Sequence, residues 1–135
     1  MPVVDASVIV SWYLEQDANF SAADRWASTS SRLGEAWHFP AIILPEIAAA
    51  IGRTFGAEAL AKRSIAAFVD LSEVHLHPVT VALATSAAAL AASLRIRGCD
   101  AIYVALAAEL DDVLVTFDRQ QLASAASVIR VLQPS

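Results

Sequence analysis

Four acidic residues of this chain stand beside apolar segments instead of within charged stretches: Asp5, Glu46, Asp100 and Asp118. Carboxylate oxygens are the ligands that hard divalent cations such as Mg²⁺ and Mn²⁺ prefer. An ion held by them lowers the pKa of its bound water and stabilises the attacking and leaving oxygens of a phosphate ester. If the four side chains share one site, the chemistry expected there is metal-dependent hydrolysis of a phosphodiester.

The segments that must position these residues alternate between short apolar strands and helices. We predict strands over residues 2–5, 36–39, 74–77, 113–116 and 128–131. Helices are predicted over residues 7–15, 20–31, 42–54, 57–71, 80–97, 100–110 and 120–124. Gly98 is expected just past the end of the 80–97 helix, a common place for glycine. The alternation favours an α/β fold, with a five-stranded, mostly parallel sheet and helices on both faces.

Sites in open parallel sheets form at the carboxyl ends of the strands. Asp5 ends the first predicted strand, Asp118 follows the fourth, and Glu46 lies early in the helix after the second. These three residues are therefore predicted to share one edge of the sheet. Asp100 begins a helix that leads into a strand, so its expected place is the opposite edge unless the chain bends back.

Each acidic residue also has a plainer structural explanation. Asp5 and Asp100 are suitable N-caps for the helices that follow them. Glu46 suits the first turn of a helix, where the helix dipole favours a carboxylate. Asp118 fits an ordinary turn. Local pattern alone leaves both interpretations open at every position.

The segments that carry the four residues resemble those of a known nuclease family. They are Val4–Val8, Leu44–Ile47, Asp100–Ala107 and Leu114–Asp118. In order, spacing and apolar context they resemble the PIN-domain nucleases, specifically the VapC-type toxins of bacterial and archaeal toxin–antitoxin pairs. The resemblance covers essentially the whole chain, residues 1–135, as a single PIN-like domain.

This resemblance implies a fold and a set of site residues. The implied strand order is 3-2-1-4-5, and in that fold the start of the helix at Asp100 joins the same pocket. The family's acidic quartet, catalytic and metal-binding, corresponds to Asp5, Glu46, Asp100 and Asp118. Ser7 and Thr116 match the supporting hydroxyl positions. The expectation is a Mg²⁺- or Mn²⁺-dependent endoribonuclease, with Asp5 and Asp100 as main ligands and the other two carboxylates binding directly or through water.

The resemblance also implies partners, namely an RNA substrate, a VapB-type antitoxin and a second copy of the chain in a homodimer. Candidate residues for an antitoxin groove are Trp12, Tyr13, Phe20 and Trp26, although plain core packing explains them equally simply. Arg97 and Arg119 are candidates to contact RNA phosphates. Arg95 and Arg97 are alternatively placed to cap the end of a helix.

Composition narrows the functional class. Hydrophobic residues make up 57% of the chain, which exceeds the share typical of soluble domains and favours a partner surface. The net charge of −5 argues against a general nucleic-acid coat protein. No membrane span or signal peptide is expected, and the single Cys99 fits a reducing cytoplasm. The histidines, His38, His75 and His77, show no zinc-site spacing and are expected to pack on strands.

Rival functions remain open on the residues alone. An Asp-nucleophile phosphatase also places an aspartate after its first strand, but that chemistry usually needs a second aspartate where Ser7 stands. A receiver-type signalling domain needs a lysine after a late strand, whereas Lys62, the chain's one lysine, lies within a predicted helix. A non-catalytic PIN-like interaction module is the remaining alternative.

Overall fold

The computed structural model describes residues 1–135 as one α/β unit built on a five-stranded sheet. The strands are β1 (Val3–Val4), β2 (Trp37–Pro40), β3 (Val74–His77), β4 (Leu114–Val115) and β5 (Val131–Leu132). The helices are α1 (Ala6–Tyr13), α2 (Phe20–Arg32), α3 (Ile43–Phe55), α4 (Glu58–Val69), α5 (Val81–Leu94), α6 (Gly98–Leu110) and α7 (Arg119–Ser124), with a 3₁₀ turn at Ala125–Ser127.

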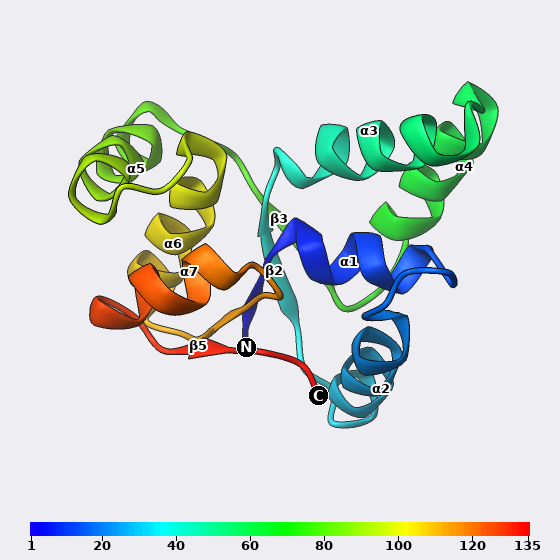
Figure 1. Ribbon diagram of the computed structural model, residues 1–135, viewed down its shortest axis with the longest axis horizontal. Coiled ribbons are helices and arrows are strands. Elements are labelled where there is room, and N and C mark those ends of the chain that lie inside the picture. The colour runs from blue at the N-terminus through cyan, green and yellow to red at the C-terminus, as the bar shows by residue number, and fades with distance from the viewer.

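All neighbouring strands are parallel and follow the order β3-β2-β1-β4-β5. This confirms the predicted fold class and the strand order implied by the resemblance. Figure 1 shows the sheet nearly edge-on, with α1 to α4 on one side and α5, α6 and α7 on the other. Because the order reverses at β1, the ends of β1 and β4 lie side by side at the edge where a parallel sheet forms its sites.

The core lies on both faces of the central strands, which carry almost only apolar residues. Val3 and Val4 of β1 and Leu114 of β4 are fully buried, as expected for strands covered by helices on each side. On the α1–α4 face, the Trp37 ring of β2 packs edge-on against Trp12, with ring centroids 5.8 Å apart. This apolar frame holds the carboxyl ends of β1 and β4 in a fixed relation.

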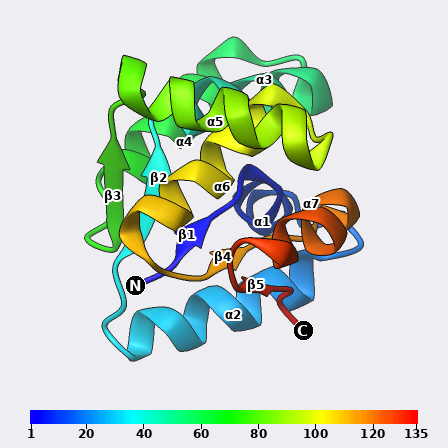
Figure 2. The same cartoon turned by 90° about the vertical axis from the view of Figure 1, so that its left-hand side faces the viewer.

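The position of α5 explains how Asp100 reaches the carboxyl edge of the sheet. In Figure 2, α5 runs across the side of the sheet to which β1, β2 and β3 point, and α6 descends beneath it. α5 packs along α6, so the chain stays at the carboxyl edge until α6 begins. The expectation that Asp100 belongs to the opposite edge on local pattern alone is therefore wrong, because α5 crosses the edge instead of returning along the sheet.

Several predicted boundaries differ from the structure for local reasons. The helix predicted over residues 80–97 ends at Leu94, because Arg95 adopts a left-handed conformation with φ 55°. Gly98 does not follow that helix but begins α6. The last strand, predicted over residues 128–131, lies instead at Val131–Leu132, because the backbone N–H groups of Val128 and Ile129 bond back to Ala125 in the preceding 3₁₀ turn.

The aromatic core of β2 provides a test of this packing. Phe39 is fully buried and its ring meets the Phe68 ring of α4 edge-on at 5.2 Å. We expect Phe39→Ala to lower the free energy of unfolding by about 3–5 kcal/mol, because it removes buried apolar surface and leaves a cavity. Phe55→Ala is the matched control, since Phe55 is 48% exposed. Urea unfolding measures both, and equal losses in the two variants would contradict the packing described.

Candidate active site

Asp5 lies at the end of β1, where its carboxylate is only 4% exposed. Its Oδ2 accepts hydrogen bonds from the Ser7 backbone N–H at 3.1 Å and from the Thr116 hydroxyl at 3.0 Å. Its Oδ1 accepts from the Gln121 side-chain amide at 3.3 Å. The bond from Ser7 makes Asp5 the N-cap of α1, so the capping role and a place in the site coexist in one residue.

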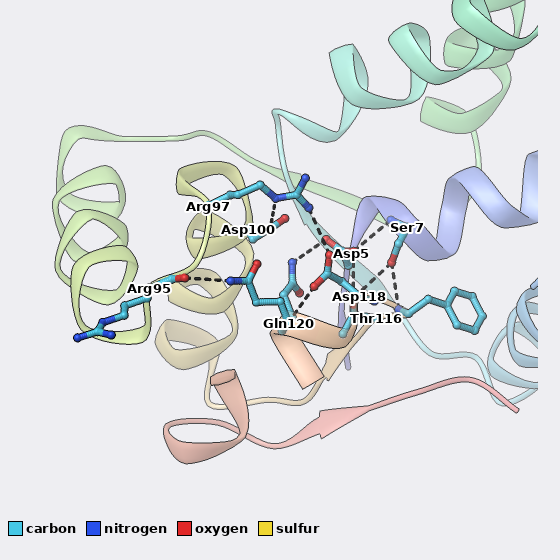
Figure 3. Close-up of polar contacts among 10 residues, drawn as sticks. Asp5, Ser7, Arg95, Arg97, Asp100, Thr116, Asp118 and Gln120 are labelled. Atoms are coloured by element: carbon cyan, nitrogen blue, oxygen red, sulfur yellow. Dashed lines mark hydrogen bonds and ion pairs between the residues drawn. The ribbon is translucent and has the colours of Figure 1, made fainter. Parts of the chain in front are cut away.

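Two hydroxyl groups join the ends of β1 and β4. Ser7 Oγ and Thr116 Oγ1 lie 3.3 Å apart, within hydrogen-bonding distance. Ser7 Oγ accepts from the backbone N–H of Phe117, and Thr116 Oγ1 accepts from that of Asp118, both at 3.0 Å. The two residues expected to support the site therefore fix the backbone on either side of it (Figure 3).

Arg97 bridges the other two aspartates. Its Nε donates to Asp100 Oδ2 at 2.9 Å, and its Nη2 donates to Asp118 Oδ2 at 3.2 Å. Figure 3 shows its side chain reaching from the start of α6 toward the end of β4. Arg97 is the N-cap residue of α6, not the end of the preceding helix. Because its side chain is 72% exposed, the guanidinium can swing away without disturbing the core.

Glu46 approaches from the first turn of α3 and is half-buried. Its Oε1 accepts a hydrogen bond from the Tyr103 hydroxyl of α6 at 3.0 Å. Tyr103 is fully buried, and burial, with the charges of Glu46 and Asp5, raises its pKa so that it stays protonated as a donor. The bond holds α3 and α6 together on the acidic side of the sheet.

The electrostatics show that the acidic side chains are close neighbours. Burial raises the pKa of Asp5 above 3.8; hydrogen bonds from Ser7 and Thr116 offset part of that rise, and the charge of Asp100 adds to it. Burial likewise raises the pKa of Glu46 above 4.5, with further contributions from the Asp5 and Asp100 charges. Asp118 joins the group through Arg97, whose pKa is raised by Asp100 first and by Asp118 and Asp5 as well.

The donor set fits a hard divalent cation. Carboxylates and hydroxyls supply oxygen atoms, the Gln121 amide contributes an N–H donor, and no histidine or cysteine sulfur takes part in the hydrogen-bond network around Asp5. No three His, Cys, Asp or Glu side chains are arranged so that they hold one ion directly. The Arg97 guanidinium takes up part of the negative charge of Asp100 and Asp118, so direct binding requires it to move, and bound water must complete the ion's shell.

Among the remaining predicted residues, Arg119 adjoins this group in the chain, whereas the aromatic residues belong to α1 and α2. Arg119 is exposed in the first turn of α7, directly after Asp118. Trp12, Tyr13 and Trp26 are partly buried and pack against the core. Phe20 begins α2 with its side chain partly exposed. Their use as a groove for an antitoxin stays a prediction.

Two residues of the site were missed by the sequence analysis. Tyr103 follows Asp100 by three positions, and that spacing, which places both on one side of α6, is the signal that could have found it. Gln121 follows Asp118 by three positions and is fully buried. A single glutamine three positions after an aspartate hardly indicates a functional residue, because most glutamine side chains are exposed to solvent.

The raised carboxyl pKa values predict a pH dependence of stability in the metal-free protein. Between its ordinary and raised pKa, a carboxyl binds more protons in the folded than in the unfolded state, so unfolding free energy falls as pH rises. Asp5→Asn keeps the helix cap but removes a buried charge. We expect this variant to gain stability relative to wild type as pH rises from about 4 toward neutral. Urea unfolding in EDTA measures the difference, and one that is constant with pH would contradict the assignment.

Gln121 is expected to orient Asp5. Its amide nitrogen donates to Asp5, while its buried Oε1 has no hydrogen-bond partner. Gln121→Leu removes the unpaired oxygen but also leaves the buried Asp5 Oδ1 without its donor, so we expect the unfolding free energy to fall by about 1–3 kcal/mol. Affinity for Mn²⁺, measured by calorimetry, should fall about tenfold, because the carboxylate loses its orienting donor. Gln120→Leu, which alters an exposed amide bonded to the Arg95 carbonyl, is the control and should bind Mn²⁺ normally.

Comparisons with known proteins agree with this geometry. The family model of the PIN domain matches residues 3–127. Comparison with curated protein sequences gives no match. None of the helices is both long and apolar enough to span a membrane.

Solved structures similar to this chain share its fold over nearly their full length. The toxin VapC20 of Mycobacterium tuberculosis, described as cleaving the Sarcin-Ricin loop, is 21% identical with a TM-score of 0.79; the match covers 99% of this chain and 100% of that one. VapBC2 of Rickettsia felis, bound to promoter DNA, is 11% identical with a TM-score of 0.75, covering 99% and 98%. A Klebsiella pneumoniae toxin–antitoxin complex is 14% identical with a TM-score of 0.71, covering 100% and 98%.

The family match spans almost the whole chain, and the sheet order agrees with the resemblance seen in the sequence. The chain belongs to the PIN domain family.

Proposed function

We propose that this protein is a Mg²⁺- or Mn²⁺-dependent endoribonuclease that acts as the VapC-type toxin of a toxin–antitoxin pair. The observation that carries the proposal is the convergence of Asp5, Glu46, Asp100 and Asp118 at one edge of the sheet in a PIN domain. Carboxylates gathered this closely repel one another unless a cation is present, and such a pocket favours binding divalent metal.

Each residue has a distinct part in this proposal. Asp5 and Asp100 are the main ligands of the ion, and Asp118 and Glu46 complete the site directly or through water. The ion would supply a water of lowered pKa and neutralise charge on the phosphate. Ser7 and Thr116 donate hydrogen bonds to the carboxylate of Asp5 and so hold it in one orientation. Attack of the water on phosphorus with loss of the 3′-oxygen leaves a 5′-phosphate and a 3′-hydroxyl.

The surroundings of the carboxylates suit a polyanionic strand. A hollow of about 540 Å³ opens beside the site, and its lining includes Ser7, Glu46 and Arg53. Arg53 lies two turns after Glu46 on the exposed side of α3, so the hollow has a cation at one end and the acidic site at the other. Arg97 bridges Asp100 and Asp118, and Arg119 directly follows Asp118 in the chain. We assign these arginines to RNA phosphates, with Arg97 leaving Asp100 when metal binds.

The similar structures support a proteinaceous partner. They include complexes of toxin with antitoxin from Klebsiella pneumoniae and Rickettsia felis. We therefore propose a VapB-type antitoxin for this chain, with Trp12, Tyr13, Phe20 and Trp26 as part of its groove. A homodimer is proposed from the apolar composition and from exposed side chains such as Val81, which is 85% exposed. The cytoplasm is the proposed location, because the RNA substrate is found there.

The alternative of a non-catalytic interaction module keeps the fold but leaves the carboxylates unused. It predicts antitoxin-like binding without cleavage. An Asp-nucleophile phosphatase is less consistent with the structure, because Ser7 donates to the carboxylate of Asp5 through its backbone and stands where a second acid is needed. Both alternatives predict no internal cleavage of RNA.

Cleavage of end-labelled RNA by the purified chain tests the proposal. We expect internal cuts with Mg²⁺ or Mn²⁺ that are abolished by EDTA and restored by added metal. Asp100→Asn should lower the rate at least about 100-fold, because it removes a ligand charge. Asp111→Asn is the matched control at the other end of α6, where a left-handed residue at φ 51° tolerates asparagine.

The control variant should cleave RNA at the wild-type rate. Equal rates for Asp100→Asn and wild type, in proteins shown to be folded, would overturn the assignment of the site. Absence of cleavage in wild type over a panel of structured and unstructured RNAs would favour the interaction module.

A further inference from the structure

The tertiary structure brings His38 together with His75 and His77, the other two histidines of the chain, which lie far from it in sequence. His38 of β2 is the register partner of His75 of β3, and His77 follows two residues later on the same strand. Register partners on adjacent strands, and residues two apart on one strand, point to the same face of a sheet. The three imidazoles therefore form a group on one face, spanning β2 and the edge strand β3.

The imidazoles are in contact and partly open to solvent. His38 Nδ1 lies 2.7 Å from His77 Nε2, so one ring nitrogen donates its proton to the lone pair of the other. The ring centroid of His38 is 5.0 Å from that of His77 and 5.3 Å from that of His75. His75 is exposed on the edge strand, whereas His38 and His77 are half-buried.

The surroundings of His38 favour its neutral imidazole, the form that binds metal. Burial lowers the pKa of His38, and the neighbouring His77, His75 and N-terminal amine lower it further. The opposing charge is Asp112, which pairs with the amine of Met1 at 3.0 Å and accepts from the Val113 backbone at 2.7 Å. Because the Asp112 carboxylate is already paired with the Met1 amine, it does little to favour the protonated form of His38.

We propose that His38 and His77, joined by His75, bind a borderline divalent cation. The bound ion would link edge strand β3 to β2, and Zn²⁺ is the probe that tests this. Imidazole nitrogen is a preferred ligand of zinc, nickel and copper, whereas magnesium prefers oxygen. The site is thus chemically distinct from the carboxylate group, and it does not depend on the nuclease proposal.

The geometry requires only a small rearrangement. Two nitrogens bound to one tetrahedral zinc ion at about 2.0–2.1 Å each lie about 3.3 Å apart. The 2.7 Å contact between His38 and His77 therefore needs to open by about 0.6 Å. The three rings do not point at one centre, so the exposed His75 must rotate to become the third ligand.

Nuclear magnetic resonance of the histidine ring nitrogens tests the proposal on the wild-type chain. The experiment uses excess Mg²⁺, which occupies the carboxylates, and then adds Zn²⁺ alone. We expect the ring-nitrogen signals of His38 and His77 to shift and to saturate at one zinc ion per chain. Zinc that leaves these signals unchanged would overturn the proposal.

Variants supply an independent readout. Calorimetry in the same buffer should show zinc affinity at least about tenfold lower in His38→Gln and in His77→Gln, because each removes a ligand. Zinc should also raise the thermal midpoint of wild type and not that of His38→Gln. Magnesium-dependent RNA cleavage is expected to be unchanged in both variants. Zinc affinity that is lost only in Asp5→Asn would place the ion at the carboxylates and contradict the proposal.

Discussion

The rest of the structure depends on one buried carboxylate. Asp5 sits where β1 meets α1, and its hydrogen bonds come from the start of α1, the end of β4 and the interior of α7. The start of α1 is more than 100 residues from the other two segments, and Ser7 and Thr116 lie within hydrogen-bonding distance across 109 positions. A charged group this deep persists because three donors compensate part of its desolvation. The same bonds give the carboxylate a single orientation, which a ligand for metal requires.

Gathering acidic side chains around Asp5 has an energetic cost, which shows in the raised pKa values of Asp5 and Glu46. Burial and mutual repulsion raise the pKa of both Asp5 and Glu46, so the acidic group is not at its most stable when fully ionised. Arg97 is the cation that this fold supplies to the group, and it reaches Asp100 and Asp118 from an exposed position. The Arg97 guanidinium stabilises the folded pocket when no metal is bound, and a metal ion can displace it from the carboxylates. Such conflicts between stability and local chemistry are typical of functional sites.

The fold was largely predictable because its signals are local. Short segments rich in strand-forming residues and followed by proline marked β2 and β3, and the alternation of strands and helices implied a parallel sheet covered on both faces. The errors fell where local signals mislead. Arg95 ends α5 in a conformation that glycine usually takes, and a 3₁₀ turn displaces β5. The strand order came from the resemblance to the PIN family, since periodicity does not encode which strands become neighbours.

The sequence by itself determined the residue types and predicted three of the four carboxylates at one edge, because Asp5 and Asp118 follow strand ends and Glu46 lies early in the helix after a strand. Only the tertiary structure decided the rest. The path of α5 brings Asp100 to that edge, and packing between distant segments places Tyr103 on Glu46 and Gln121 on Asp5. The same holds for His38 and His77, which meet through the pairing of β2 with β3. Contacts of this kind depend on strand order and register, which are set by the packing of the whole chain and leave no periodic trace in any one segment.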